Sequence, residues 1–112
     1  MTLYHGSHKN ETLVAHVGLC LTDREEVAQV YAGSQGWLHV VAIDLGSMVV
    51  EECDGYDHDS NSCPADDVSF CLAAAARGVD VLAYQDEDER GRRHVCYRLV
   101  SDKAISALSV QK

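Results

Sequence analysis

The sequence has few of the features that mark membrane, disulfide-rich or disordered proteins. It contains one proline, one tryptophan and one phenylalanine in 112 residues, of which 46% are hydrophobic. Its longest strongly apolar stretches, at 40–43 and 72–76, are far shorter than the ~20 residues that cross a bilayer. The N-terminal residues lack the basic start and apolar run of a secretory signal. We therefore expect one cytoplasmic domain over residues 1–112.

Positive charge is also scarce in this chain. Nine Lys and Arg stand against 18 Asp and Glu, which gives a formal net charge of −9. Contact with phosphate backbones needs clustered cations, so direct binding of nucleic acid is not expected. Most of these acidic residues are expected to lie on the solvated surface, where they keep the protein in solution. The composition leaves a second role open, in which an acidic protein occupies a site meant for DNA or RNA.

The cysteines show no pattern of a disulfide framework or a zinc ribbon. There are five of them, an odd number, and none forms a Cys-x-x-Cys pair. Cys53 and Cys63 bracket an acidic segment with His58, but their spacing matches no tetrahedral ligand pattern, so no metal site is predicted. We expect Cys53 and Cys63 to be free thiols at the rim of an acidic loop.

Short strands and two helices are predicted along the chain. Strands are expected at 3–5, 17–21, 37–45, 48–50, 79–84 and 95–100. The strand at 37–45 is apolar on both alternating faces, which favours a central strand covered on both sides. The segment 51–67 indicates a long loop, and Gly91 favours a hairpin between the last two strands. This order predicts an α+β domain with a mixed β-sheet and two main helices.

Each predicted helix has start and stop signals. The first begins at a capping box formed by Thr22 and Glu25 and ends at Gly33. Its buried face is predicted to contain Val27, Val30 and Tyr31. The second helix has Pro64 near its first position and Asp66 and Asp67 in its first turn, and it ends with Arg77 followed by Gly78. The stripe expected to be buried on it consists of Val68, Cys71, Leu72 and Ala75.

The sequence lacks the GxGxxG, P-loop, HExxH and GxSxG motifs, and its informative residues are of another kind. "YHGS" at 4–7 ends the first strand, and "GLCLT" at 18–22 enters a helix that ends in "YA" at 31–32. A valine-rich strand follows. This order resembles the ADP-ribosyltransferases of the His-Tyr-acid class, most clearly over 3–45 and more faintly over 78–110.

The resemblance implies an NAD-binding role for four residues near the N-terminus. His5 would hydrogen-bond the adenosine-side ribose, and Gly6 would let the backbone approach the nicotinamide amide. Ser7 belongs to the same cofactor-binding motif. Tyr31 would stack on the nicotinamide ring, since a flat cationic ring favours an aromatic face. The alternatives are core packing of Tyr31 beside Val27 and a purely structural strand-end role for His5.

The third residue of the class is an acid that stabilises the ribosyl cation, and here the sequence departs from the common pattern. His94 stands where that acid often opens the last strand. Small phage anti-CRISPR ADP-ribosyltransferases look similar here and have an Asp in the preceding turn. By that resemblance Asp86 is the first candidate for the catalytic acid and Asp88 the second. The alternative for both residues is a solvated charged turn.

The resemblance therefore implies an NAD-dependent mono-ADP-ribosyltransferase that modifies a protein target. A phage-encoded inhibitor of a host or CRISPR complex would fit a compact acidic chain. Two alternatives stay open on the sequence. One is a catalytically inactive relative that binds a partner through its acidic surface, as an anti-CRISPR or nucleic-acid mimic, and the other is an NAD glycohydrolase of the same fold.

Overall fold

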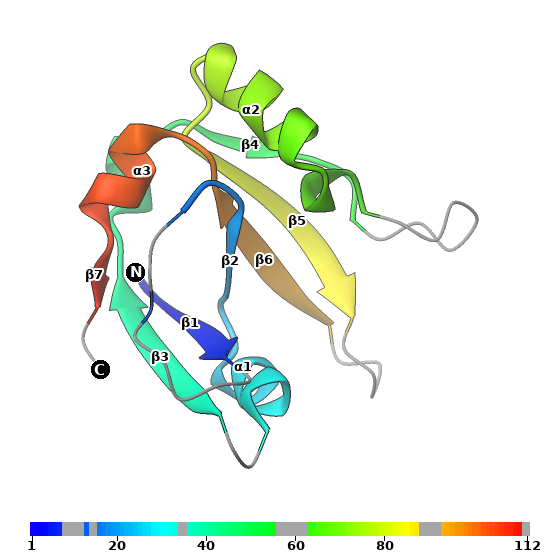
Figure 1. Cartoon of the computed structure of the whole chain (residues 1–112), viewed down its shortest axis with the longest axis vertical. Coiled ribbons are helices and arrows are strands. Elements are labelled where there is room, and N and C mark those ends of the chain that lie inside the picture. The colour runs from blue at the N-terminus through cyan, green and yellow to red at the C-terminus, as the bar shows by residue number, and fades with distance from the viewer. Residues whose placement is uncertain (8–12, 14–15, 34–35, 56–62, 88–92, 111–112) are drawn as a thin grey trace.

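Seven strands form one mixed β-sheet in the computed structural model, in the order β4-β5-β6-β2-β1-β3-β7 (Figure 1). The structure describes residues 1–7, 13, 16–33, 36–55, 63–87 and 93–110. The strands are Thr2–Ser7 (β1), Leu19–Thr22 (β2), Trp37–Ala42 (β3), Val50–Glu52 (β4), Val81–Glu87 (β5), Arg93–Leu99 (β6) and Ser109–Val110 (β7). β4 and β5 pair in parallel, and all other neighbours are antiparallel. The predicted α+β class is confirmed.

The helices are Glu25–Ala32 (α1), Val68–Ala76 (α2) and Asp102–Ala107 (α3), with 3₁₀ turns at Leu45–Ser47 (η1) and Pro64–Asp66 (η2). α1 lies over the β1–β3 half of the sheet, and α2 lies beside the β4–β5 half (Figure 1). The short α3 and β7 were not predicted from the sequence. No helix among the described residues has the length and apolar character needed to cross a membrane.

A hydrophobic core lies on each face of the sheet. One core joins β5 and β6 to α2 and contains Leu82, Tyr84, Cys96, Cys71 and Ala74. The other joins the central strands to α3 and contains Leu3, Leu21, Val41, Leu99 and Ala104. Successive residues of a strand point to opposite faces, so β5 and β6 each contribute buried residues to both cores.

The first helix departs from its prediction at its start and in its buried face. β2 continues as far as Thr22, which pairs with Cys96 of β6, so the helix begins only at Glu25 and has no side-chain cap. The predicted capping box is therefore wrong. Val27 is buried as expected, but the rest of the buried face is Ala28 and Ala32, while Val30 and Tyr31 are exposed. Small residues are needed there because the helix backbone lies directly against β1.

The second helix is also shifted from its prediction. Pro64 begins a 3₁₀ turn, and α2 itself starts at Val68, after Asp67, whose carboxylate accepts the Ser69 amide at 2.9 Å. Of the predicted stripe, Cys71 is buried and Ala75 packs against the core, but Val68 and Leu72 are exposed and were wrongly predicted to be buried. The residues that α2 buries in the core are Cys71 and Ala74.

Several strand predictions also need correction. β3 ends at Ala42 and lies second from the sheet edge, and its burial alternates, with His39 and Val41 buried and Trp37 exposed. It is therefore not a central strand covered on both sides. The segment predicted as a loop from residue 51 begins within β4, which pairs with β5. β5 and β6 are longer than predicted, so residues 85–87 belong to the strand.

Candidate functional site

A cavity of about 820 Å³ lies on the face of the sheet that α1 and α2 flank. Its lining residues come from β1, β2, α1, β5 and β6 and from the segment just before α2. Tyr4, Thr22 and Cys96 are neighbours across three strands and form part of its floor. The volume lies in the upper part of the range for small-molecule and cofactor sites.

His5 lies in β1 at the side of this cavity. Its Nδ1 donates a hydrogen bond to the Cys20 carbonyl of β2 at 2.8 Å. In a neutral imidazole, a proton on Nδ1 makes Nε2 the acceptor nitrogen. The ring also lies 6.0 Å from that of His39, its partner across the β1–β3 ladder. His5 is thus held in a defined tautomer beside the cavity.

Gly6 also lines the cavity, but glycine is required at this position because the backbone of α1 packs against it. A Cβ at this position would lie 1.9 Å from the Ala28 backbone oxygen and 2.8 Å from the Ala32 nitrogen. The close approach at Gly6 is therefore made by α1. Ser7, the next residue of the motif, pairs with Trp37 in the β1–β3 ladder and is not among the described residues that line the cavity.

Tyr31 projects from α1 at the cavity and is 50% exposed. The alternative that it packs in the core beside Val27 is therefore wrong, since Val27 is fully buried and Tyr31 is not. An aromatic side chain at the wall of a cavity can offer its face to a flat ligand.

Asp86 is part of β5 rather than of a turn, because the β5–β6 ladder continues through Glu87. It pairs directly with His94 of β6, and its Oδ1 accepts the backbone amide of Glu87 at 2.9 Å. Asp86 is half-buried and lines the cavity, and so does the buried His94. The second candidate acid, Asp88, lies outside the described residues.

The tertiary structure adds a polar network that the sequence analysis did not single out. Arg98 donates from Nε to the Tyr84 hydroxyl at 2.9 Å and from Nη1 to the Gly18 carbonyl at 3.2 Å, and it forms an ion pair with Asp66. The Cys20 sulfur lies 3.8 Å from the same Tyr84 hydroxyl. The signal that could have revealed this network is the recurrence of polar residues at every second position of predicted strands.

The pKa values of the two cysteines, Cys20 and Cys96, shift in opposite directions. A hydrogen bond from the Cys96 thiol and the nearby Arg98 guanidinium outweigh the effect of burial and lower the pKa of Cys20 to about 7. Donation of that hydrogen bond, together with burial, raises the pKa of Cys96. Burial is the main cause that raises the pKa of Tyr84. Cys20 is therefore the more acidic thiol of this pair.

The comparisons with known proteins give no family for this chain. A scan against protein-family models found no match, and neither did searches of curated proteins and of solved structures. The chemistry of the cavity is therefore inferred from its own side chains. They comprise an aromatic wall, an imidazole of fixed tautomer and a carboxylate, which suit a flat, positively charged ligand.

Proposed function

We propose that this protein is a mono-ADP-ribosyltransferase that uses NAD as co-substrate and modifies a protein target. One observation carries the proposal: His5, Tyr31 and Asp86 come from β1, α1 and β5, and all three line one cavity. These are the residues that the sequence resemblance links to NAD. They are far apart in the chain. If the match to these short motifs were due to chance, there would be no reason to expect the three residues in one cavity.

In this proposal, Tyr31 and His5 hold the two halves of the dinucleotide. The half-exposed ring of Tyr31 stacks on the nicotinamide, a flat cationic ring that is attracted to an aromatic face. The other ring nitrogen of His5, Nε2, accepts a hydrogen bond that a ribose hydroxyl donates. Gly6 keeps α1 against β1 and so keeps Tyr31 at the cavity. Ser7 remains with them as part of the proposed cofactor-binding motif.

The proposed reaction begins with cleavage of the nicotinamide N-glycosidic bond. Nicotinamide leaves with the bonding electron pair, and positive charge develops on the ribose at C1″. The Asp86 carboxylate stabilises that charge electrostatically, and a nucleophile of the target then bonds to C1″ and loses its proton. The Glu87 amide fixes the Asp86 carboxylate before the reaction, so little reorganisation is needed.

The net charge of the chain indicates which targets it fits. A protein of formal charge −9 is attracted to basic surfaces, and nucleic-acid-binding proteins present them. A host nucleic-acid complex, such as a CRISPR effector, is the target class that we propose, with the chain acting in the cytoplasm as a phage-encoded inhibitor. Electrostatic attraction of this kind mainly increases the association rate.

A catalytically inactive binder is the second candidate function, and one observation favours it. His94 occupies the position where the family has its acid, and it is buried directly opposite Asp86. If Asp86 cannot replace the family acid, the cavity binds NAD without cleaving it. The protein would then act only by binding a partner through its acidic surface and occupying the partner's binding site.

The test measures three quantities for the same preparations: NAD affinity by calorimetry, release of nicotinamide, and transfer of label from NAD to the proteins of a bacterial lysate. We expect Asp86→Asn to lower turnover by about 10²- to 10³-fold and to change NAD affinity less than about twofold. Glu87→Gln is the matched control, since it removes a neighbouring charge of the same strand, and we expect less than about a threefold effect.

Each outcome distinguishes a function. Labelled proteins together with released nicotinamide support the transferase, and nicotinamide without label indicates a glycohydrolase. NAD binding without either product indicates the inactive binder. If the folded wild-type protein binds no NAD at millimolar concentration, the proposal is wrong. If the wild type is active and Asp86→Asn keeps that activity, the acid has been misassigned, and Asp88→Asn is the next variant to measure.

A further inference from the structure

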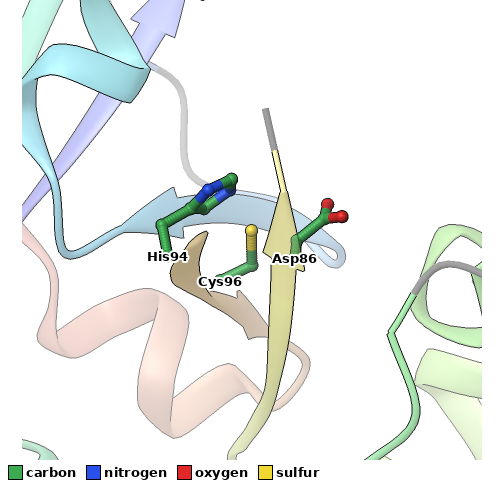
Figure 2. A group of neighbouring side chains, drawn as sticks. All are labelled: Asp86, His94 and Cys96. Atoms are coloured by element: carbon green, nitrogen blue, oxygen red, sulfur yellow. The ribbon is translucent and has the colours of Figure 1, made fainter. Parts of the chain in front are cut away.

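Asp86, His94 and Cys96 form a compact group of metal-ligating side chains at one side of the cavity. Each offers one ligand atom, and these three atoms lie within 4.8 Å of one another. Figure 2 shows all three projecting from the same side of β5 and β6. We propose that they bind one divalent transition-metal ion of the zinc class, with a further coordination position open to the cavity.

The strand register places these residues together. Asp86 pairs directly with His94 in the antiparallel β5–β6 ladder, and directly opposite residues have Cβ atoms about 5 Å apart. His94 and Cys96 are two positions apart in β6, so their side chains share a face. All three donors therefore stand on paired strands, which are more precise platforms for a metal than loops are.

The donor set selects the kind of metal. One carboxylate oxygen, one imidazole nitrogen and one thiol sulfur suit Zn²⁺, while Ca²⁺ and Mg²⁺ take oxygen ligands. Around a tetrahedral Zn²⁺ ion, bond lengths of about 2.0–2.3 Å put such ligand atoms roughly 3.3–3.6 Å apart. The present separations, all below 4.8 Å, reach that range through small rotations of the side chains.

The surroundings resemble those of an open site rather than a closed structural one. His94 and Cys96 are 4% and 5% exposed, while Asp86 is half-buried, and all three line the cavity. Three protein ligands leave a fourth tetrahedral position, which water or a cavity ligand can fill. Asp86 Oδ1 already accepts the Glu87 amide, so we expect its second oxygen to coordinate the metal.

The metal site does not rest on NAD binding, but it would affect the proposed reaction. Asp86 is the carboxylate assigned to the ribosyl cation, and a bound cation would neutralise it. Zinc is then expected to inhibit turnover in a transferase that is otherwise active. Metal binding can be measured without NAD, so a failure of one proposal is distinguishable from a failure of the other.

The test uses the full, tag-free chain, reduced and freed of metal with a chelator, and titrates it with Co²⁺. Binding by Cys96 predicts a thiolate-to-cobalt charge-transfer band and the visible bands of tetrahedral cobalt, with one ion per chain and displacement by Zn²⁺. We expect Cys96→Ser to abolish the charge-transfer band. We expect His94→Gln and Asp86→Asn to weaken cobalt binding at least about tenfold. Cys53→Ser is the control, because it removes a partly buried thiol that does not line the cavity, and it should retain the band.

Three results would overturn the proposal: no charge-transfer band in the wild type, a band that persists in Cys96→Ser, or a band that is lost in Cys53→Ser. Cys96 and His94 are buried, so their variants are first checked for folding by circular dichroism. Asp86 is half-buried and gives a variant that we expect to fold. Unchanged cobalt affinity in folded Asp86→Asn would also contradict the site.

Discussion

Two tyrosines at the cavity differ in exposure, and we propose different roles for them. Tyr84 is 4% exposed, and its hydroxyl accepts a hydrogen bond from Arg98. Tyr31 is 50% exposed and projects from a helix that buries its small residues instead. A buried tyrosine with a satisfied hydroxyl stabilises the fold, while a half-exposed ring at a cavity is available to a ligand. Ligand binding is therefore the role that we propose for Tyr31.

The first prediction concerns Tyr31→Ala. Because the side chain is half exposed, we expect the free energy of unfolding to fall by less than about 1 kcal/mol. Loss of the stacking surface should weaken NAD binding by about tenfold. Val30→Ala is the control, since Val30 is 41% exposed on the same helix and does not line the cavity. A large loss of stability, or unchanged NAD affinity, would contradict the assignment.

The contact between α1 and β1 is the element-scale feature on which the cavity depends. Gly6 leaves room for the backbone of the helix, and Ala28 and Ala32, four residues apart, are the small side chains on its buried face. This close contact explains why the larger Val30 and Tyr31 point outward. The position of Tyr31 at the cavity is thus a consequence of how the helix packs.

The second prediction tests this packing with Gly6→Ala. The added Cβ would lie 1.9 Å from the Ala28 oxygen, which is backbone and cannot rotate away. We expect a loss of about 3 kcal/mol or more in the free energy of unfolding, measured by urea denaturation. Gly46→Ala is the control, because its Cβ would meet only the Asp44 side chain at 3.3 Å. A Gly6→Ala protein as stable as the wild type would show that α1 is not packed as described.

At the scale of the whole molecule, Asp80 connects three segments that are distant in sequence. Its carboxylate accepts the Val49 amide at 2.8 Å and the Ser101 hydroxyl at 2.6 Å. Ser101 in turn accepts the Ala104 amide and caps α3. The hydrogen bonds from Ser101 and Val49 hold the pKa of Asp80 below its ordinary value. The segment before β4, the start of β5 and α3 are thereby joined by one buried charge.

The third prediction is a pH dependence of stability that arises from Asp80. A carboxyl group with a lowered pKa stabilises the folded state above its ordinary pKa of 3.8, and the effect is lost as the pH falls through the folded-state pKa. We expect Asp80→Asn to cost about 2 kcal/mol at pH 7 and progressively less below pH 4. Denaturant melts at several pH values measure this difference. Asp54→Asn is the control, since Asp54 is exposed, and its difference in unfolding free energy from the wild type should not shrink in this way at low pH. If the Asp80→Asn difference stays constant down to pH 2, Asp80 does not have the proposed effect on stability.

Much of the fold follows from local sequence signals. The alternation of apolar residues indicated the main strands, and Gly33 and Gly78 mark the ends of two helices, where both adopt positive φ angles. These signals act within a few residues, so a sequence pattern captures them. The buried faces of the helices were predicted less well. The buried face of α1 is set by its close packing on Gly6, and Gly6 lies in another element.

The sequence by itself determined the α+β class, the approximate strands and helices and the chemical identity of His5, Tyr31 and Asp86. Only the tertiary structure decided that these residues share a cavity, and that Asp86, His94 and Cys96 bring their ligand atoms within 4.8 Å. The physical reason is strand register. Side chains alternate with a period of two, so a shift of one residue in the β5–β6 ladder would turn Asp86 away from that face, and no local signal specifies which register forms.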